Sequence, residues 1–76
     1  MCLAVPGRVA EILGGNWVLI ETFGLTGKVG THLVGEVAVG DYLVVHAGYA
    51  IEKLDLEEAR ERIRIWEELL AHDAIG

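Results

Sequence analysis

The hydrophobic residues of this chain follow two patterns, and the change between them falls near residue 55. Before that point, short runs rich in valine, leucine and isoleucine are separated by glycine-containing turns, which is typical of β-strands. Turn signals stand at residues 14–16, 24–27 and 40–41. The pattern predicts strands at residues 8–13, 17–23, 26–29, 33–39, 42–47 and 50–54. Short strands in such close succession indicate a small meander or barrel.

The last third of the chain predicts an α-helix from Asp55 to about His72, a stretch without glycine or proline. Asp55 with Glu58 three residues later forms an acidic variant of the capping box, which fixes the helix start. Apolar residues then recur at steps of three and four on one helical face: Leu56, Ala59, Ile63, Trp66 and Leu70. Ile65 and Leu69 widen this stripe, so the helix is predicted to dock on the barrel. The chain is therefore mainly β: a small β-barrel over residues 1–54 and one C-terminal helix over residues 55–76, within a single domain.

Length, charge and cysteine content narrow the class of protein. A chain of 76 residues has room for one core, and its 53% hydrophobic content can supply that core without a disulfide, which a single cysteine cannot form. The net charge of −6, from 12 acidic and 6 basic residues, argues against nucleic-acid binding, because phosphate contacts require lysine and arginine. No apolar run is long enough to span a membrane. A lone cysteine without an export signal favours the cytoplasm.

Cys2 is the strongest candidate for a chemical role. A free cysteine is often a small buried hydrophobic residue, but the extreme N terminus is seldom ordered enough to serve as core. Removal of Met1 would leave a thiol and a partly cationic α-amine on one residue, and this amine would favour the thiolate. A thiolate is both a nucleophile and a soft metal ligand. Retention of Met1 removes the amine and leaves an exposed thiol. Pro6-Gly7 has the sequence of a turn that fixes where this segment emerges.

Three histidines are the other candidates. His46 ends the apolar run that begins at Tyr42, where a histidine is either a structural group or a ligand. His32 lies beside a glycine-rich turn, His72 lies at the end of the helix, and the spacing of these residues predicts no closed metal site made by this chain alone. Gly48 either permits a turn or lets a ligand or partner approach closely.

Two motifs in this order resemble the signatures of the HypC/HupF family of hydrogenase maturation chaperones. The first is the opening Met1-Cys2-Leu3-Ala4-Val5-Pro6-Gly7. The second is Gly40-Asp41-Tyr42-Leu43-Val44-Val45-His46-Ala47-Gly48-Tyr49-Ala50-Ile51. The resemblance covers essentially the whole chain, including the short acidic helix.

The resemblance implies an OB-like β-barrel with a C-terminal helix, acting in the cytoplasm as a chaperone rather than an enzyme. Members of the family hold iron together with the iron–sulfur protein HypD while cyanide and carbon monoxide are attached. They then pass the Fe(CN)2CO unit to the precursor of the [NiFe] hydrogenase large subunit. By matching position, Cys2 would be the thiol that binds iron and partners, and His46 would lie near the iron or at the HypD interface. Pro6 and Gly7 would shape the N-terminal segment. No permanently bound cofactor is implied.

This chain departs from the family at Gly30-Thr31-His32, where many members have a more apolar strand, so His32 receives no family role. The loop at residues 35–40 is short for the family, which bears on the choice of hydrogenase partner. Two alternatives remain from the residues themselves. An OB-like module for nucleic acid would need a basic groove and more aromatic residues than the 7% present. A thiol enzyme using Cys2 would need a base, and only His46 is a candidate.

Overall fold

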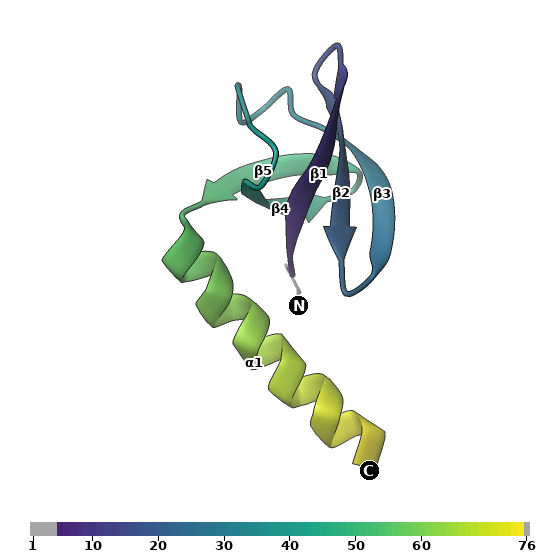
Figure 1. The fold of residues 1–76 in the computed structure, drawn as a ribbon, viewed down its shortest axis with the longest axis vertical. Coiled ribbons are helices and arrows are strands. Elements are labelled where there is room, and N and C mark those ends of the chain that lie inside the picture. The colour runs from purple at the N-terminus through teal and green to yellow at the C-terminus, as the bar shows by residue number, and fades with distance from the viewer. Residues whose placement is uncertain (1–4, 76) are drawn as a thin grey trace.

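The computed structural model describes residues 5–75, with side chains described as far as residue 71. Five strands precede one helix: β1 (Pro6–Gly14), β2 (Trp17–Thr22), β3 (Leu25–Gly30), β4 (Tyr42–His46), β5 (Tyr49–Leu54) and α1 (Leu56–Ile75). The strands form a closed barrel in the order β1-β2-β3-β5-β4, with the helix extending from one side (Figure 1). The predicted fold class, a small β-barrel followed by one C-terminal helix, is confirmed.

Three two-residue turns connect the consecutive antiparallel pairs β1–β2, β2–β3 and β4–β5, and all six turn residues have positive φ. They are Gly15-Asn16, Phe23-Gly24 and Ala47-Gly48. Turns of this kind match the right-handed twist of the strands they join, and they favour glycine and asparagine. The second turn lies one step earlier than its glycine signal indicated, because Leu25 and Gly27 belong to β3.

The predicted strand at residues 33–39 is wrong. The Thr31 carbonyl accepts hydrogen bonds from the backbone N–H groups of Val34 (3.2 Å) and Gly35 (3.1 Å), which makes a turn. Val34 and Val37 then pack against the core, while Leu33 and Val39 are 71% and 60% exposed. The partly buried positions are thus three residues apart, whereas a strand with one buried face requires a separation of two.

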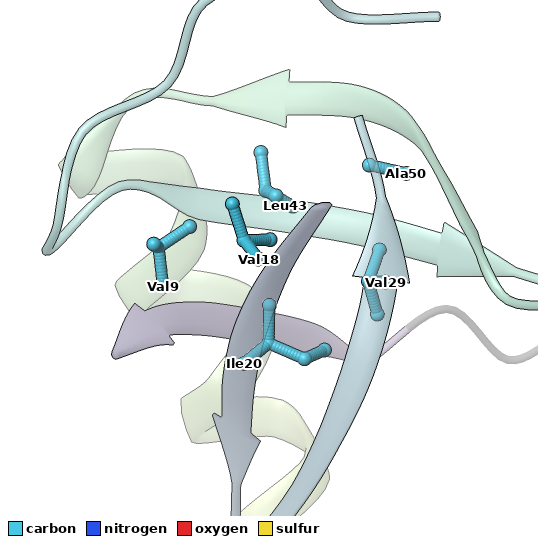
Figure 2. Packing of buried hydrophobic residues seen from close by; sticks show 6 residues of the cluster. All are labelled: Val9, Val18, Ile20, Val29, Leu43 and Ala50. Atoms are coloured by element: carbon cyan, nitrogen blue, oxygen red, sulfur yellow. The ribbon is translucent and has the colours of Figure 1, made fainter. Parts of the chain in front are cut away.

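The interior of the barrel is filled by six aliphatic side chains, with at least one from every strand (Figure 2). They are Val9, Val18, Ile20, Val29, Leu43 and Ala50. A second, smaller cluster on the outside of the barrel joins Val44 and Leu54 to Ala59 of α1, with Tyr42 packed against it. Because β4 supplies both Leu43 and Val44, this strand is buried on both faces.

The helix begins as the capping pattern predicts, and the Glu58 backbone N–H donates to Oδ1 of Asp55 at 2.8 Å. Ala59 is fully buried, but only this first part of the helix is held firmly against the barrel. The helix packs on the barrel through Ala59, whereas Ile65 and Leu69, the two residues that widen the apolar stripe, are 46% and 51% exposed. Figure 1 shows the reason: α1 leaves the barrel at an angle, and its second half extends past the strands.

Gly7 of β1 is buried at a position where the barrel has no room for a side chain. A Cβ on this residue would lie 2.5 Å from Cδ1 of Ile20 and 2.9 Å from Oγ1 of Thr22. We expect Gly7→Ala to lower the free energy of unfolding by about 1–3 kcal/mol, because Ile20 belongs to the core and must shift. Urea denaturation followed by tryptophan fluorescence measures this change.

The matched control for this substitution is Gly27→Ala in β3, where a Cβ meets nothing within 4 Å. The free energy of unfolding of the Gly27→Ala protein is expected to change by less than about 1 kcal/mol. Equal losses in the two variants would show that crowding at Ile20 is not the cause.

Candidate functional site

The start of β1 and the end of β4 lie at the same edge of the barrel. The two strands are antiparallel, and Pro6 pairs with Val44, two residues before His46. The chain therefore enters the barrel beside the strand end that carries His46. Cys2, the predicted iron-binding thiol, lies outside the described residues, so its position relative to His46 stays a prediction.

Pro6 and Gly7 do not form the predicted turn. They are the first two residues of β1, both are buried, and they pair with Val44 and Leu43 of β4. The absence of a side chain on Gly7 lets β1 pack closely against Ile20 and Thr22 of β2. The dipeptide thus fixes the point at which the N-terminal segment meets the barrel through strand pairing and close packing.

His46 is the last residue of β4, and it is exposed. It stands directly opposite Tyr49 in the antiparallel β4–β5 pair, so the two side chains share one face of the sheet. An exposed imidazole at this edge can offer a nitrogen to a metal ion or a hydrogen bond to a partner.

An aromatic cluster of Trp17, His32 and Tyr49 continues from His46. The ring centroids of Trp17 and His32 are 5.4 Å apart, and Tyr49 lies 5.8 Å from the first and 5.7 Å from the second. Gly30 makes room for this cluster, since a Cβ there would lie 2.6 Å from Cδ1 of Tyr49 and 3.0 Å from Nδ1 of His32. These distances suit edge-to-face contacts between aromatic rings.

The sequence patterns do not predict this cluster, because they give His32 no role and place Trp17 in a strand without a partner. The three rings come from β2, the segment after β3, and β5, so no local spacing joins them. The one signal in the sequence is the glycine before Thr31-His32, which marks a position where a neighbouring side chain approaches closely.

Gly48 owes its place to the backbone conformation of the β4–β5 turn. Its φ is +87°, and no atom lies within 4 Å of a Cβ built on it. Its carbonyl accepts a hydrogen bond of 3.0 Å from the Gly30 N–H, which ties the turn to β3. Of the two explanations for a glycine at position 48, the need for a turn is therefore sufficient.

The described part of the chain holds neither a grouped set of metal ligands nor a membrane span. Among residues 5–75, no three histidine, cysteine, aspartate or glutamate side chains are grouped to hold a metal ion. The same residues contain no helix with the length and hydropathy required to cross a membrane.

The fold and the residues at this edge define a small barrel-and-helix protein whose two sequence motifs meet at the β1–β4 pairing. Comparison with known proteins agrees with this description. The model of the HupF/HypC family matches residues 1–66. The chain belongs to the HupF/HypC family, which confirms the resemblance seen in its two motifs.

Several relatives are similar over most of their length. The chain is 43% identical to the hydrogenase maturation factor HypC of Rhizobium leguminosarum bv. viciae over 97% of this chain and 99% of that protein. It is 39% identical to the hydrogenase maturation factor HypC of Helicobacter hepaticus over 92% of this chain and 83% of that protein. The hydrogenase maturation factor HypC of Escherichia coli (strain K12) is 32% identical over 83% of this chain and 76% of that protein.

Ala47, next to His46, adopts a backbone conformation that suits glycine. Its φ is +55°, which costs an L-residue other than glycine about 1–2 kcal/mol. We expect Ala47→Gly to raise the free energy of unfolding by about 0.5–1 kcal/mol, since the relief exceeds the added entropy of the unfolded chain. The shift of the urea midpoint measures this gain.

Ala38→Gly is the control for this substitution, because Ala38 lies in an exposed segment and has no positive φ. The free energy of unfolding of this variant is expected to fall by about 0.4–1 kcal/mol, because glycine raises the entropy of the unfolded chain. A loss of the same size in Ala47→Gly would contradict the argument from φ.

Proposed function

We propose that this protein is a hydrogenase maturation chaperone and iron carrier. Together with HypD it holds iron while cyanide and carbon monoxide are attached, and it delivers the Fe(CN)2CO unit to the precursor of a [NiFe] hydrogenase large subunit. Family membership supports the role in maturation. The structural observation that carries the proposal is the pairing of Pro6 with Val44, which brings the N-terminal motif to the strand end that bears His46.

Cys2 is the proposed iron ligand. It lies four positions before Pro6 in the sequence, and an extended chain of four residues spans at most about 14 Å. This covalent link to β1 supports the proposal that the Cys2 thiol acts near the β1–β4 edge. A thiolate is a strong ligand for iron, and a ligand near the chain terminus can serve two protein partners in turn.

His46 is the proposed supporting residue, at the iron or at the interface with HypD. Its side chain is exposed at the end of β4, where the antiparallel turn fixes its backbone. A carrier has to release its cargo, and one thiolate with ligands shared by a partner releases iron more readily than a closed set of four protein ligands. Gly48 and the buried Pro6-Gly7 pair support the site by fixing the two backbone segments that meet there.

The proposal predicts that Cys2→Ala leaves the barrel folded but abolishes iron retention and binding of the large-subunit precursor. The residue precedes the strands, so the substitution removes a ligand and leaves the core unchanged. The measurement is anaerobic co-purification with HypD, followed by infrared spectroscopy for cyanide and carbon monoxide bound to metal. Full hydrogenase maturation with the Cys2→Ala protein would overturn the proposal.

His46→Ala is expected to weaken the same infrared bands or the complex with HypD. His32→Ala is the matched control, because it removes another exposed imidazole that has no proposed contact with the iron. Equal effects in the two variants would show that the loss is not specific to the His46 imidazole.

A further inference from the structure

The barrel closes between β3 and β5 through very little backbone pairing. Among the described residues, only Gly30 and Tyr49 pair, in parallel orientation, and the Gly30 N–H also donates to the Gly48 carbonyl at 3.0 Å. Upstream of Gly30, β3 pairs with β2 alone among the described strands. Figure 1 shows β3 on the outer side of the β2–β3 hairpin, with its lower part away from β5.

The direction of the Gly30 N–H reveals which backbone groups of β3 are free. Because this N–H points away from β2, Gly30 and Trp17 form a non-hydrogen-bonded pair of the β2–β3 ladder. Such pairs alternate with hydrogen-bonded pairs along an antiparallel ladder. Thr26 and Lys28, at steps of two from Gly30, therefore also direct their N–H and C=O groups away from β2. Over residues 5–75, no backbone partner receives these groups.

We propose that this edge of β3, at Thr26 and Lys28, is a strand-docking site for an extended segment of the large-subunit precursor. Among residues 5–75, the two N–H and two C=O groups of Thr26 and Lys28 have no backbone partner, and their spacing is that of a β-ladder, so they are complementary to an extended backbone. Only the identity of the partner rests on the proposed function. A precursor that has not yet closed around its metal site can supply an extended chain, whereas a folded partner pairs most of its backbone groups internally.

The side chains around the edge define the segment that fits. Leu25 is 76% exposed, and a Cβ on Gly27 would meet nothing within 4 Å, so one face of the edge offers apolar surface and open space. On the other face, Nζ of Lys28 lies 5.1 Å from the centroid of the Trp17 ring, and no described carboxylate pairs with it. The best segment alternates an apolar residue with aspartate or glutamate.

Neither protection against pairing nor self-association accounts for the open edge of β3. A lysine on an edge strand can prevent unwanted pairing, but here the Lys28 side chain lies over Trp17 and leaves the backbone groups open. A second copy of this chain, paired antiparallel about Gly27 so that Thr26 and Lys28 of both copies take part, would place a threonine opposite each Lys28 and would supply no carboxylate for its ammonium group.

The edge also lies beside the proposed iron site. The hydrogen bond between Gly30 and Gly48 joins the end of β3 to the turn that follows His46. A segment docked at Thr26 and Lys28 would thus be held next to the region from which iron is transferred. Strand docking at this position would raise the local concentration of the precursor near the iron unit that it receives.

The experiment compares proline with alanine at the two positions. Thr26→Pro and Lys28→Pro remove an N–H that the β2–β3 ladder does not use, while Thr26→Ala and Lys28→Ala change the side chain and keep the N–H. We expect each proline variant to bind the purified precursor at least about tenfold more weakly than its alanine counterpart, through the lost hydrogen bond and the bulk of the ring. HypD binding is expected to stay within about twofold of the wild-type Kd.

Amide hydrogen exchange on the wild-type protein, followed by NMR, keeps the test independent of any folding defect in the proline variants. The amides of Thr26 and Lys28 are expected to exchange at least about tenfold more slowly in the complex with the precursor than in the free protein.

Unchanged exchange in a formed complex overturns the docking proposal and leaves the iron-carrier role standing. The docking proposal is also overturned if these amides exchange slowly in the free protein in a way that depends on protein concentration, which would indicate self-association. Protection by HypD instead of the precursor overturns it as well. Protection at the edge in a complex that never carries iron-bound cyanide refutes the carrier role alone, and failure to bind either partner refutes both.

Discussion

The pairing of β1 with β4 closes the barrel on one side and fixes the edge at which the proposed site is built. Pro6 and Gly7 supply this pairing from the first motif, and Leu43 and Val44 supply it from the second. Gly7 has to be a glycine because β2 lies within van der Waals distance on its inner side. The same contact that completes the core thus brings the start of β1 beside the strand that ends in His46, and folding and site assembly depend on one set of interactions.

The other closure of the barrel, between β3 and β5, contrasts with this one. Among residues 5–75, a single residue pair joins the two strands, and the aromatic cluster around Gly30 reinforces the junction with side chains. A closed barrel removes free strand edges only where its closure is complete. Here the incomplete closure leaves the backbone of Thr26 and Lys28 open. The proposed iron site lies at the more extensively paired β1–β4 closure, and the partly paired β3–β5 closure offers a surface for an extended partner.

The helix adds a third feature that the strands alone would not provide. Ala59 packs tightly on Val44 and Leu54, so the outer face of β4 is buried and this strand has apolar neighbours on both sides. This explains the unbroken run Tyr42-Leu43-Val44-Val45, which does not alternate as a half-exposed strand does. The remainder of α1 extends beyond the barrel, with Ile65 and Leu69 half exposed, and its ion pairs lie on the surface.

Local patterns in the amino-acid sequence are enough to define the class of fold, the helix start at Asp55 and the family, because strand runs, capping residues and contiguous motifs need no distant partner. They misassign residues 33–39, since an apolar run does not reveal whether its buried positions are two or three residues apart until a core exists to pack against. They also indicate a turn at Pro6-Gly7, because only the presence of β2 and β4 makes that dipeptide part of a paired strand. The cluster of Trp17, His32 and Tyr49 and the open edge of β3 belong to the tertiary structure alone, because both arise from where strands distant in sequence meet and where they part.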